Sequence, residues 1–224
     1  MRTIKLILLT LLLSSRVFAQ EQTPQEIKLN SKEDTLQYAV GAFIGQWMVK
    51  NNLQVTNANI FLSAMDAALN NKPLAVADSS IAPIVAAYQL SAQIDRSKLL
   101  EEQLFASLKG KTGVGVLPSG VHYIIIETGQ GNRPVSSDDI VFHAKGVFPD
   151  GTLLEDTYQK NQPVTNLLSN LIPGLNESIQ LMPVGSKWRI FIPSALAYGS
   201  IGIQGKVPPY MALVFDIELI EIKE

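Results

Sequence analysis

The chain has 224 residues, of which 46% are hydrophobic, with 18 Lys and Arg against 20 Asp and Glu and no Cys. This length allows one large or two ordinary domains with buried cores, and the hydrophobic content excludes disorder as the general state. Without Arg2, Lys5 and Arg16, which lie in the N-terminal segment expected to be removed, the net charge moves from −2 to −5, and this mildly acidic balance argues against a nucleic-acid partner. Without cysteine there is no disulfide framework and no thiol redox role.

The first 19 residues have the layout of a cleavable secretory signal. Basic residues precede a mostly apolar run, Ile7–Leu13, and small or apolar residues lead up to Ala19. We expect cleavage after Ala19, a mature N-terminal segment over residues 20–33, and a periplasmic or secreted protein. A retained transmembrane anchor is the weaker alternative because the run is too short to span a bilayer. No Cys is present to carry a lipid.

Residues 34–108 have helical periodicity and predict an all-α domain. Apolar residues recur on one face of two segments: Leu36, Val40, Phe43, Ile44 and Trp47, then Phe61, Ala64, Met65, Ala68 and Leu69. A third helix is expected to begin after Asp78–Ser80, to hold Pro83 in its first turn and to run to about Leu108.

The glycine-rich stretch 109–120 predicts a linker. Beyond it, residues 121–224 predict an α+β domain. Strand composition, rich in Ile, Val and Phe, is found in residues 121–128, 139–148, 186–193 and 211–222. Asp150-Gly151 predicts a turn, and residues 173–182 predict a short helix.

A search for catalytic motifs gives mostly negative results. The two histidines, His122 and His143, lie on separate predicted strands without Cys partners, which gives a zinc site little support. Residues 110–112, Gly-Lys-Thr, resemble the end of a phosphate-binding P-loop. However, Phe105 stands where the first glycine of that motif should be, and a predicted helix precedes it instead of a strand, so we discard a P-loop. Neither a nucleophile elbow nor a dinucleotide fingerprint occurs. We therefore expect no cofactor and no metal.

The loop 193–209 carries an unusual number of apolar side chains. These are Leu196, Tyr198, Ile201, Ile203 and Val207. Loops are usually solvated, so such residues either fold back over the core or bind something. The residues alone leave both alternatives open.

Several motifs between residues 117 and 222 resemble the FKBP family of peptidyl-prolyl cis-trans isomerases. In chain order they are LPSGVHYIII, DGT, IPGLNESIQLMPVGSKWRIFIP, LAYG, VPP and LVFDIELI. Upstream, YAVGAFIGQWM and FLSAMDAAL are similar to the dimerising helical domain of exported bacterial members, the macrophage infectivity potentiator type. The resemblance implies an antiparallel half-barrel sheet wrapped around one short helix, after the all-α domain.

The resemblance also implies a function. It predicts an isomerase that assists the folding of exported proteins by acting on their proline-containing segments, with no cofactor. It further implies a homodimer formed through the N-terminal helices. The alternative for those helices is a monomeric domain that buries its apolar residues internally.

The same resemblance implies an apolar pocket between helix and sheet. Catalysis would fall to Tyr198, Phe215, Ile172 and Glu155, with the Tyr198 hydroxyl bonded to a substrate carbonyl. Substrate would be bound by Leu154, Val164, Leu171, Leu175, Val207 and Ala144.

Several of these positions depart from the family pattern. Ala144 replaces a Tyr, Leu154-Glu155 replaces Phe-Asp, Val164 replaces a Phe and Leu175 replaces a Trp. The replacements are mostly apolar, so we expect a pocket that persists with fewer aromatic edges and is wider at Ala144. This implies a weakened isomerase. The alternative is a non-catalytic dimeric periplasmic chaperone on the same fold.

Overall fold

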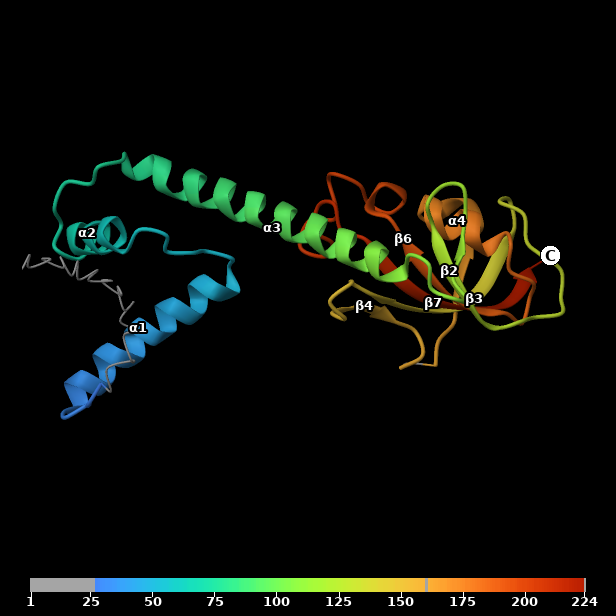
Figure 1. Cartoon of the computed structure of the whole chain (residues 1–224), viewed down its shortest axis with the longest axis horizontal. Helices are drawn as coiled ribbons and strands as arrows, with labels where there is room; N and C mark the ends of the chain where they lie inside the picture. The colour runs from blue at the N-terminus through green and yellow to red at the C-terminus, as the bar shows by residue number, and fades with distance from the viewer. Residues whose placement is uncertain (1–26, 160, 224) are drawn as a thin grey trace, which may run out of the picture. The chain divides into compact units, whose positions relative to one another are not determined.

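The computed structural model describes residues 27–159 and 161–223 (Figure 1). The expected signal over residues 1–19 and the start of segment 20–33 lie outside these residues. The chain divides into two compact units, one ending at Trp47 and one spanning Met48–Glu224. The domain boundaries expected at residues 34–108, 109–120 and 121–224 stay a prediction. In the described part, no helix combines the length and the apolar character needed to cross a membrane.

Helices α1 (Lys32–Lys50), α2 (Ala58–Leu69) and α3 (Asp78–Leu108) confirm the helical periodicity of the first half. Two of them begin where a side chain satisfies a free backbone N–H. The Asp34 N–H donates to Ser31 Oγ at 2.9 Å, and the Ser31 N–H donates to Asp34 Oδ2 at 3.0 Å, which forms a capping box for α1. The Ile60 N–H donates to Asn57 Oδ1 at 3.1 Å at the start of α2.

The C-terminal half of α3 belongs to the packing of the second unit. Its buried residues are Ser97 and Leu108, and Leu108 packs in a cluster with Phe191 and Val214. Phe191 and Val214 alternate along their strands with residues of the main core. Because successive side chains point to opposite faces of a sheet, this cluster lies on the face opposite that core.

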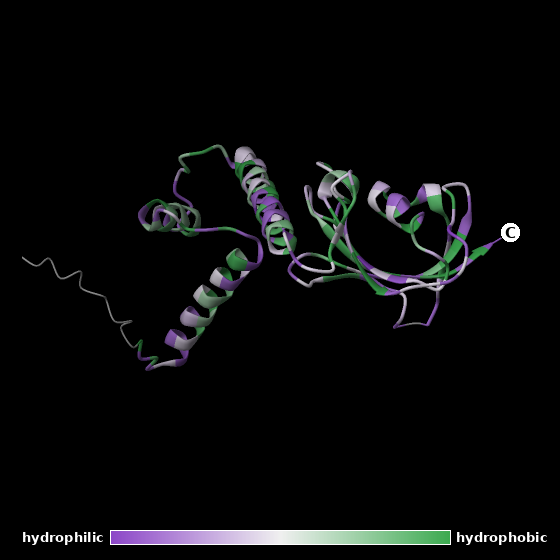
Figure 2. Cartoon of the chain, turned by 45° about the vertical axis from the view of Figure 1, so that its right-hand side comes forward, coloured by the Kyte–Doolittle hydropathy of each residue, from purple (hydrophilic) through white to green (hydrophobic). Residues whose placement is uncertain are grey.

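The second unit contains a strongly curved antiparallel sheet (Figure 2). Its strands are β1 (Gly115–Val116), β2 (His122–Glu127), β3 (Asp139–Val147), β4 (Leu153–Asp156), β5 (Val164–Leu167), β6 (Lys187–Ile192) and β7 (Leu213–Lys223). They follow the order β1-β2-β6-β7-β3-β4, and β5 also pairs with β3. Strands β2, β3, β6 and β7 confirm the predicted segments. We did not predict β4, β5 or β1, and β1 lies inside the expected linker.

The short helix α4 (Pro173–Ile179) lies directly against the sheet. It begins with proline at a position where no N–H is required, and its buried side includes Gly174 and Leu175. A Cβ at Gly174 would collide with Cγ2 of Ile192 on β6, so only glycine permits this approach. The core between α4 and the sheet includes Val121, Ile140, Phe142, Leu168, Ile179, Met182, Ile190, Leu213, Ile217 and Leu219. The predicted α+β class, with helices first and an antiparallel sheet around a short helix, is confirmed.

Candidate functional site

A pocket of about 510 Å³, which we call the rim pocket, lies between β4 and the loop 193–209. It is lined by Leu153, Leu154, Glu155, Tyr198, Ile203, Gly205, Lys206 and Val207. Strand β4 supplies the first three of these residues, and the loop supplies the others. Leu153, Leu154, Ile203 and Val207 give the pocket apolar walls, and Glu155, Tyr198 and Lys206 place polar groups among them. Ligand pockets commonly combine apolar walls with a few placed polar groups.

The loop has a defined conformation. Ile203 N–H donates to the Val207 carbonyl at 2.7 Å, and Val207 N–H donates to the Ile203 carbonyl at 2.8 Å. Gly202 has a φ of +68°, and a Cβ there would collide with the carbonyl oxygen of Val207, so this tight turn requires glycine. As a result Val207 is 2% exposed, whereas Ile201 is 86% exposed. The loop therefore covers the core with some of its apolar side chains and leaves another in solvent.

Glu155 and Tyr198 are the polar groups with shifted pKa values at this pocket. Partial burial raises the pKa of the Glu155 carboxyl above its ordinary value. Burial, and then the negative charge of Glu155, raise the pKa of the Tyr198 hydroxyl. The hydroxyl therefore stays protonated at neutral pH. It makes no hydrogen bond to another described residue, so it is available as a donor inside the pocket.

Other predicted site residues lie in the core rather than on the pocket surface. Phe215 and Ala144 are each 2% exposed and Leu175 is 5% exposed, all within the main core cluster against which Leu154 and Tyr198 pack. We expected the pocket to be wider at Ala144. Ala144 is not among the residues that line the pocket, and the widening at this position stays a prediction.

Three predicted residues lie elsewhere. Ile172 precedes α4 and packs partly buried against the core. Leu171 lines a different hollow of about 530 Å³ beside the outer side of α4, with Asn176 and Leu181. Val164 is 36% exposed on β5, paired with Phe142. The structure thus brings Leu154, Glu155, Tyr198 and Val207 to one pocket, and the roles assigned to all ten residues stay a prediction.

Some lining residues were missed by sequence reasoning. Ile203 was noted only as an apolar loop residue, and Lys206 and Leu153 were not predicted at all. Their position in the chain could have indicated them. Leu153 is next to Leu154, Lys206 is next to Val207, and Ile203 lies a few residues before Val207 in the same loop. Within residues 27–159 and 161–223, no group of three or more His, Asp or Glu side chains could hold a metal ion.

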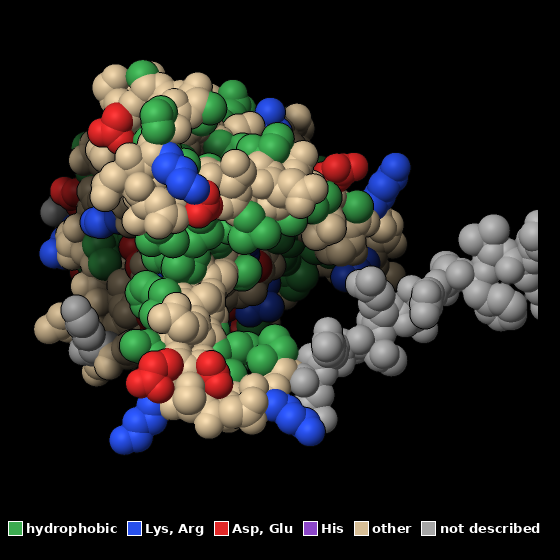
Figure 3. All heavy atoms as spheres, turned by 90° about the vertical axis from the view of Figure 1, so that its left-hand side faces the viewer, with side chains coloured by type: hydrophobic (Ala, Val, Ile, Leu, Met, Phe, Trp, Pro, Cys, Tyr) green, Lys and Arg blue, Asp and Glu red, His purple; other side chains and the backbone are tan. Residues whose placement is uncertain are grey.

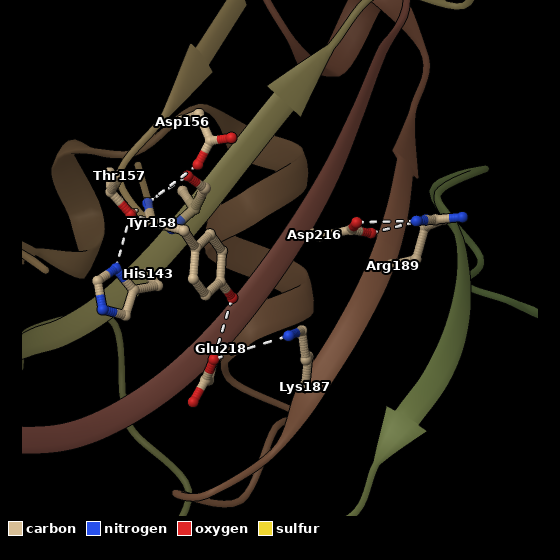
Figure 4. Close-up of polar contacts among 9 residues, drawn as sticks. His143, Asp156, Thr157, Tyr158, Lys187, Arg189, Asp216 and Glu218 are labelled. Atoms are coloured by element: carbon tan, nitrogen blue, oxygen red, sulfur yellow. Dashed lines mark hydrogen bonds and ion pairs between the residues drawn. The ribbon is translucent and has the colours of Figure 1, made fainter. Parts of the chain in front are cut away.

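A polar cluster on the sheet holds the segment that follows β4 in place (Figure 4). Thr157 Oγ1 lies 2.8 Å from His143 Nδ1, and the His143 ring stacks on the Tyr158 ring at 4.6 Å between centroids. The Tyr158 hydroxyl donates to Glu218 Oε2 at 3.1 Å, and Lys187 Nζ lies 3.8 Å from the same oxygen. His143 therefore has a structural role, and the cluster fixes the end of the strand that carries Glu155.

The fold and the pocket define a class of protein: a curved antiparallel sheet wraps around one short helix, carries a pocket at its rim, and follows a set of helices in the chain. Comparisons with known proteins agree. The family model described as "FKBP-type peptidyl-prolyl cis-trans isomerase" matches residues 131–220. The model described as "Domain amino terminal to FKBP-type peptidyl-prolyl isomerase" matches residues 33–125.

Whole-chain relatives extend this result. An outer membrane protein MIP of Legionella longbeachae is 30% identical over 234 residues, covering 100% of this chain and 98% of the relative. An FKBP-type peptidyl-prolyl cis-trans isomerase, FkpA of Aeromonas hydrophila, is 30% identical over 94% of this chain and 85% of its own length. The crystal structure of FkpA from Escherichia coli matches the fold with a TM-score of 0.61 and 24% identity, over 88% of this chain and 99% of that one. The chain belongs to the FKBP-type peptidyl-prolyl cis-trans isomerase family, with the amino-terminal domain that accompanies it.

Proposed function

We propose that the protein is a peptidyl-prolyl cis-trans isomerase that acts on proline-containing segments of unfolded exported proteins. The observation that carries the proposal is the rim pocket, which combines apolar walls with one protonated hydroxyl, that of Tyr198, free to donate. Leu154 and Val207 would contact the proline ring, and Tyr198 would hold a neighbouring carbonyl.

The chemistry of the reaction fits such a site. Rotation about an X–Pro bond is slow because the planar amide is stabilised by resonance, with a barrier of about 18–20 kcal/mol. The planar form is the more polar one, so a pocket with little water penalises it relative to the twisted form. Tyr198 is partly buried at this pocket, with its ring against the core. Bond rotation needs no proton transfer, so Tyr198 would act by orienting and binding.

We further propose that the site is a weakened one. Leu154 offers no aromatic edge, Val164 is an aliphatic side chain on β5, and Leu175 and Ala144 are buried without rings. Fewer aromatic edges give fewer contacts that are specific to the twisted amide. The same observations favour the second candidate, a chaperone that holds client segments without accelerating isomerisation.

We also propose a homodimer formed through the N-terminal helices. Helix α1 has no buried residue, and Leu36, Tyr38 and Phe43 are 60%, 54% and 69% exposed. Hydrophobic side chains lie open on the face shown in Figure 3. A Cβ at Gly41 or Gly45 would meet nothing within 4 Å, which leaves room for another backbone. Apolar surface of this extent is costly in water and is typical of an interaction site.

Light scattering at micromolar protein tests the dimer. We expect dimer mass for the wild type, a shift toward monomer for Gly45→Leu, and little change for Gly45→Ala. Monomer mass for the wild type would contradict the proposal. Mass spectrometry of the exported protein tests the proposed periplasmic or secreted location, since residues 1–19 should be absent from it.

A proline-isomerisation assay on a short Phe-Pro peptide, run beside an aggregation assay, tests the main proposal. We expect acceleration by the wild type and a loss of about twofold to tenfold in kcat/KM for Tyr198→Phe, since a hydrogen bond is worth about 0.5–1.5 kcal/mol. The urea midpoint of this variant should not change. No acceleration over buffer, with aggregation suppression kept in Tyr198→Phe, would establish the chaperone instead.

A further inference from the structure

A second hollow, of about 450 Å³, adjoins the rim pocket. Ile203, Gly205, Lys206 and Val207 line both. The remaining walls differ, because the second hollow is closed by helix α3 and by the turn after β3. Its further lining residues are Leu90, Gln93, Phe148, Ile201, Gln204, Pro208 and Pro209. We call it the α3 hollow.

Two large apolar side chains of the α3 hollow are exposed to solvent. Leu90 is 50% exposed, and Ile201 is 86% exposed at the tip of the loop. They come from distant parts of the sequence and line the same hollow. The need to cover the core explains Val207 but does not explain Ile201. An apolar hollow with open walls, of a size within the usual range of about 300–1,000 Å³ for ligand pockets, indicates a binding site.

Helix α3 is held in place next to this hollow. Ser97, one turn beyond Gln93, is fully buried and donates its hydroxyl to the Gln93 carbonyl at 2.9 Å. Arg96 of α3 also forms an ion pair with Asp150, with Nη2 at 3.0 Å from Oδ2. Asp150 belongs to the turn after β3 that also contains Phe148.

A further contact fixes α3 to the start of the loop. The Ser194 N–H donates to Glu101 Oε2 at 3.2 Å. Exposed ion pairs stabilise little individually. Together with the burial of Ser97, these contacts bring α3, the turn and the loop into a common arrangement. The hollow therefore exists before any ligand binds.

We propose that the α3 hollow is a second subsite, which binds an apolar side chain of the same client segment whose proline occupies the rim pocket. The inference rests on the proposed isomerase or holding function of that pocket. An extended chain advances about 3.3 Å per residue and presents alternate side chains to one side. Since the two hollows share a wall, the side chain bound by the α3 hollow belongs to a residue close to the proline. Leu90 and Ile201 would thus select clients that carry Leu, Ile, Met or Phe there.

Peptide affinity measured by fluorescence anisotropy on the full-length chain tests the subsite. The probes are short labelled peptides with one proline among alanines, in which one flanking alanine at a time is replaced by Phe. We expect one position at which Phe improves affinity by about tenfold, the lower end of what an apolar pocket provides. Leu90→Ala and Ile201→Ala should each reduce that preference by about threefold or more.

Leu99→Ala is the matched control, because Leu99 is 52% exposed on the same helix and lines neither hollow. It should keep the preference of the wild type. Equal affinity for all peptides, or a preference unchanged in both Leu90→Ala and Ile201→Ala, would overturn the subsite. Isomerisation of the all-alanine peptide is followed in parallel to separate the two proposals. No acceleration of it would contradict the isomerase activity. The ratios of peptide affinities alone decide whether the α3 hollow is a subsite.

Discussion

Replacing Gly146 with alanine tests how closely β3 packs on the core beside the rim pocket. Gly146 pairs with Phe215 across β3 and β7, and an added Cβ would lie 2.6 Å from Cε1 and 3.0 Å from Cζ of that ring. Carbon atoms pack at about 3.5–4.0 Å, so the ring has to move by about 1 Å. Overpacking of this kind costs about 1–3 kcal/mol, offset by about 0.5–1 kcal/mol because glycine is itself unfavourable in a strand. We expect a net loss of stability of about 0.5–2 kcal/mol.

Urea unfolding followed by Trp188 fluorescence measures this loss. Trp188 is 5% exposed in the core and stacks on Tyr123 at 4.6 Å between centroids. The chain has 2 Trp residues, so a Trp47→Phe background leaves Trp188 as the sole tryptophan reporter. The unfolding midpoint should fall while its slope stays the same, because the surface exposed on unfolding is unchanged.

A double-variant cycle supplies the control. Phe215→Leu shortens the side chain that the new methyl group meets, so Gly146→Ala should cost less in that background than in the wild type, by about 0.5 kcal/mol or more. An unchanged midpoint for Gly146→Ala, or strictly additive losses, would refute the close packing of β3 on this ring.

Three further predictions concern the walls of the rim pocket and their support. Ala144→Tyr places a ring at a position that is only 2% exposed. We expect it to lower the free energy of unfolding by about 1–3 kcal/mol, measured from urea unfolding, and not to raise activity. Equal stability together with a higher kcat/KM would show that the position is open. Because burial raises the pKa of Glu155, the folded state binds a proton more tightly than the unfolded state, and its stability falls as pH rises from about 4.5 through the raised pKa. Glu155→Gln should therefore gain stability relative to the wild type as pH rises to neutral, and urea midpoints that diverge in the opposite sense would contradict this. Tyr158→Phe keeps the stack on His143 but loses the hydrogen bond to Glu218, so it should cost about 0.5–1 kcal/mol by the same measurement and speed amide exchange in the segment after β4; unchanged exchange there would show that the hydroxyl does not hold the segment.

Helices α1 to α3 and the long strands could be predicted because their apolar residues recur in the local sequence with the spacing or the composition typical of a helix or a strand. Strands β4 and β5 could not, since Leu153–Asp156 and Val164–Leu167 are too short and too polar to show alternation. They are strands because β3 pairs with both.

The pocket shows the same division between local and tertiary information. Tyr198 and Val207 follow from the loop motif that resembles the family. The burial of Ala144 depends on how a curved sheet closes over a small residue. The presence of Leu90 opposite Ile201 depends on where a long helix meets a loop that is distant in sequence. Local patterns hold no information on either point.

Helix α3 has 31 residues, and its fully buried and nearly buried members, Ser97 and Leu108, both lie in its second half. In the first half Ile84 and Tyr88 are 56% and 44% exposed. The first half is about 15 residues long, and an isolated helix of about 12–15 residues is only marginally stable in water. Amide hydrogens from Ser97 onward should therefore exchange with solvent only when the sheet opens, whereas those near the N-terminus of the same helix should exchange by local fraying. Deuterium uptake along α3 would thus report two opening free energies, one for local fraying and one for opening of the sheet. The change from one to the other should fall between Tyr88 and Ser97, next to the α3 hollow.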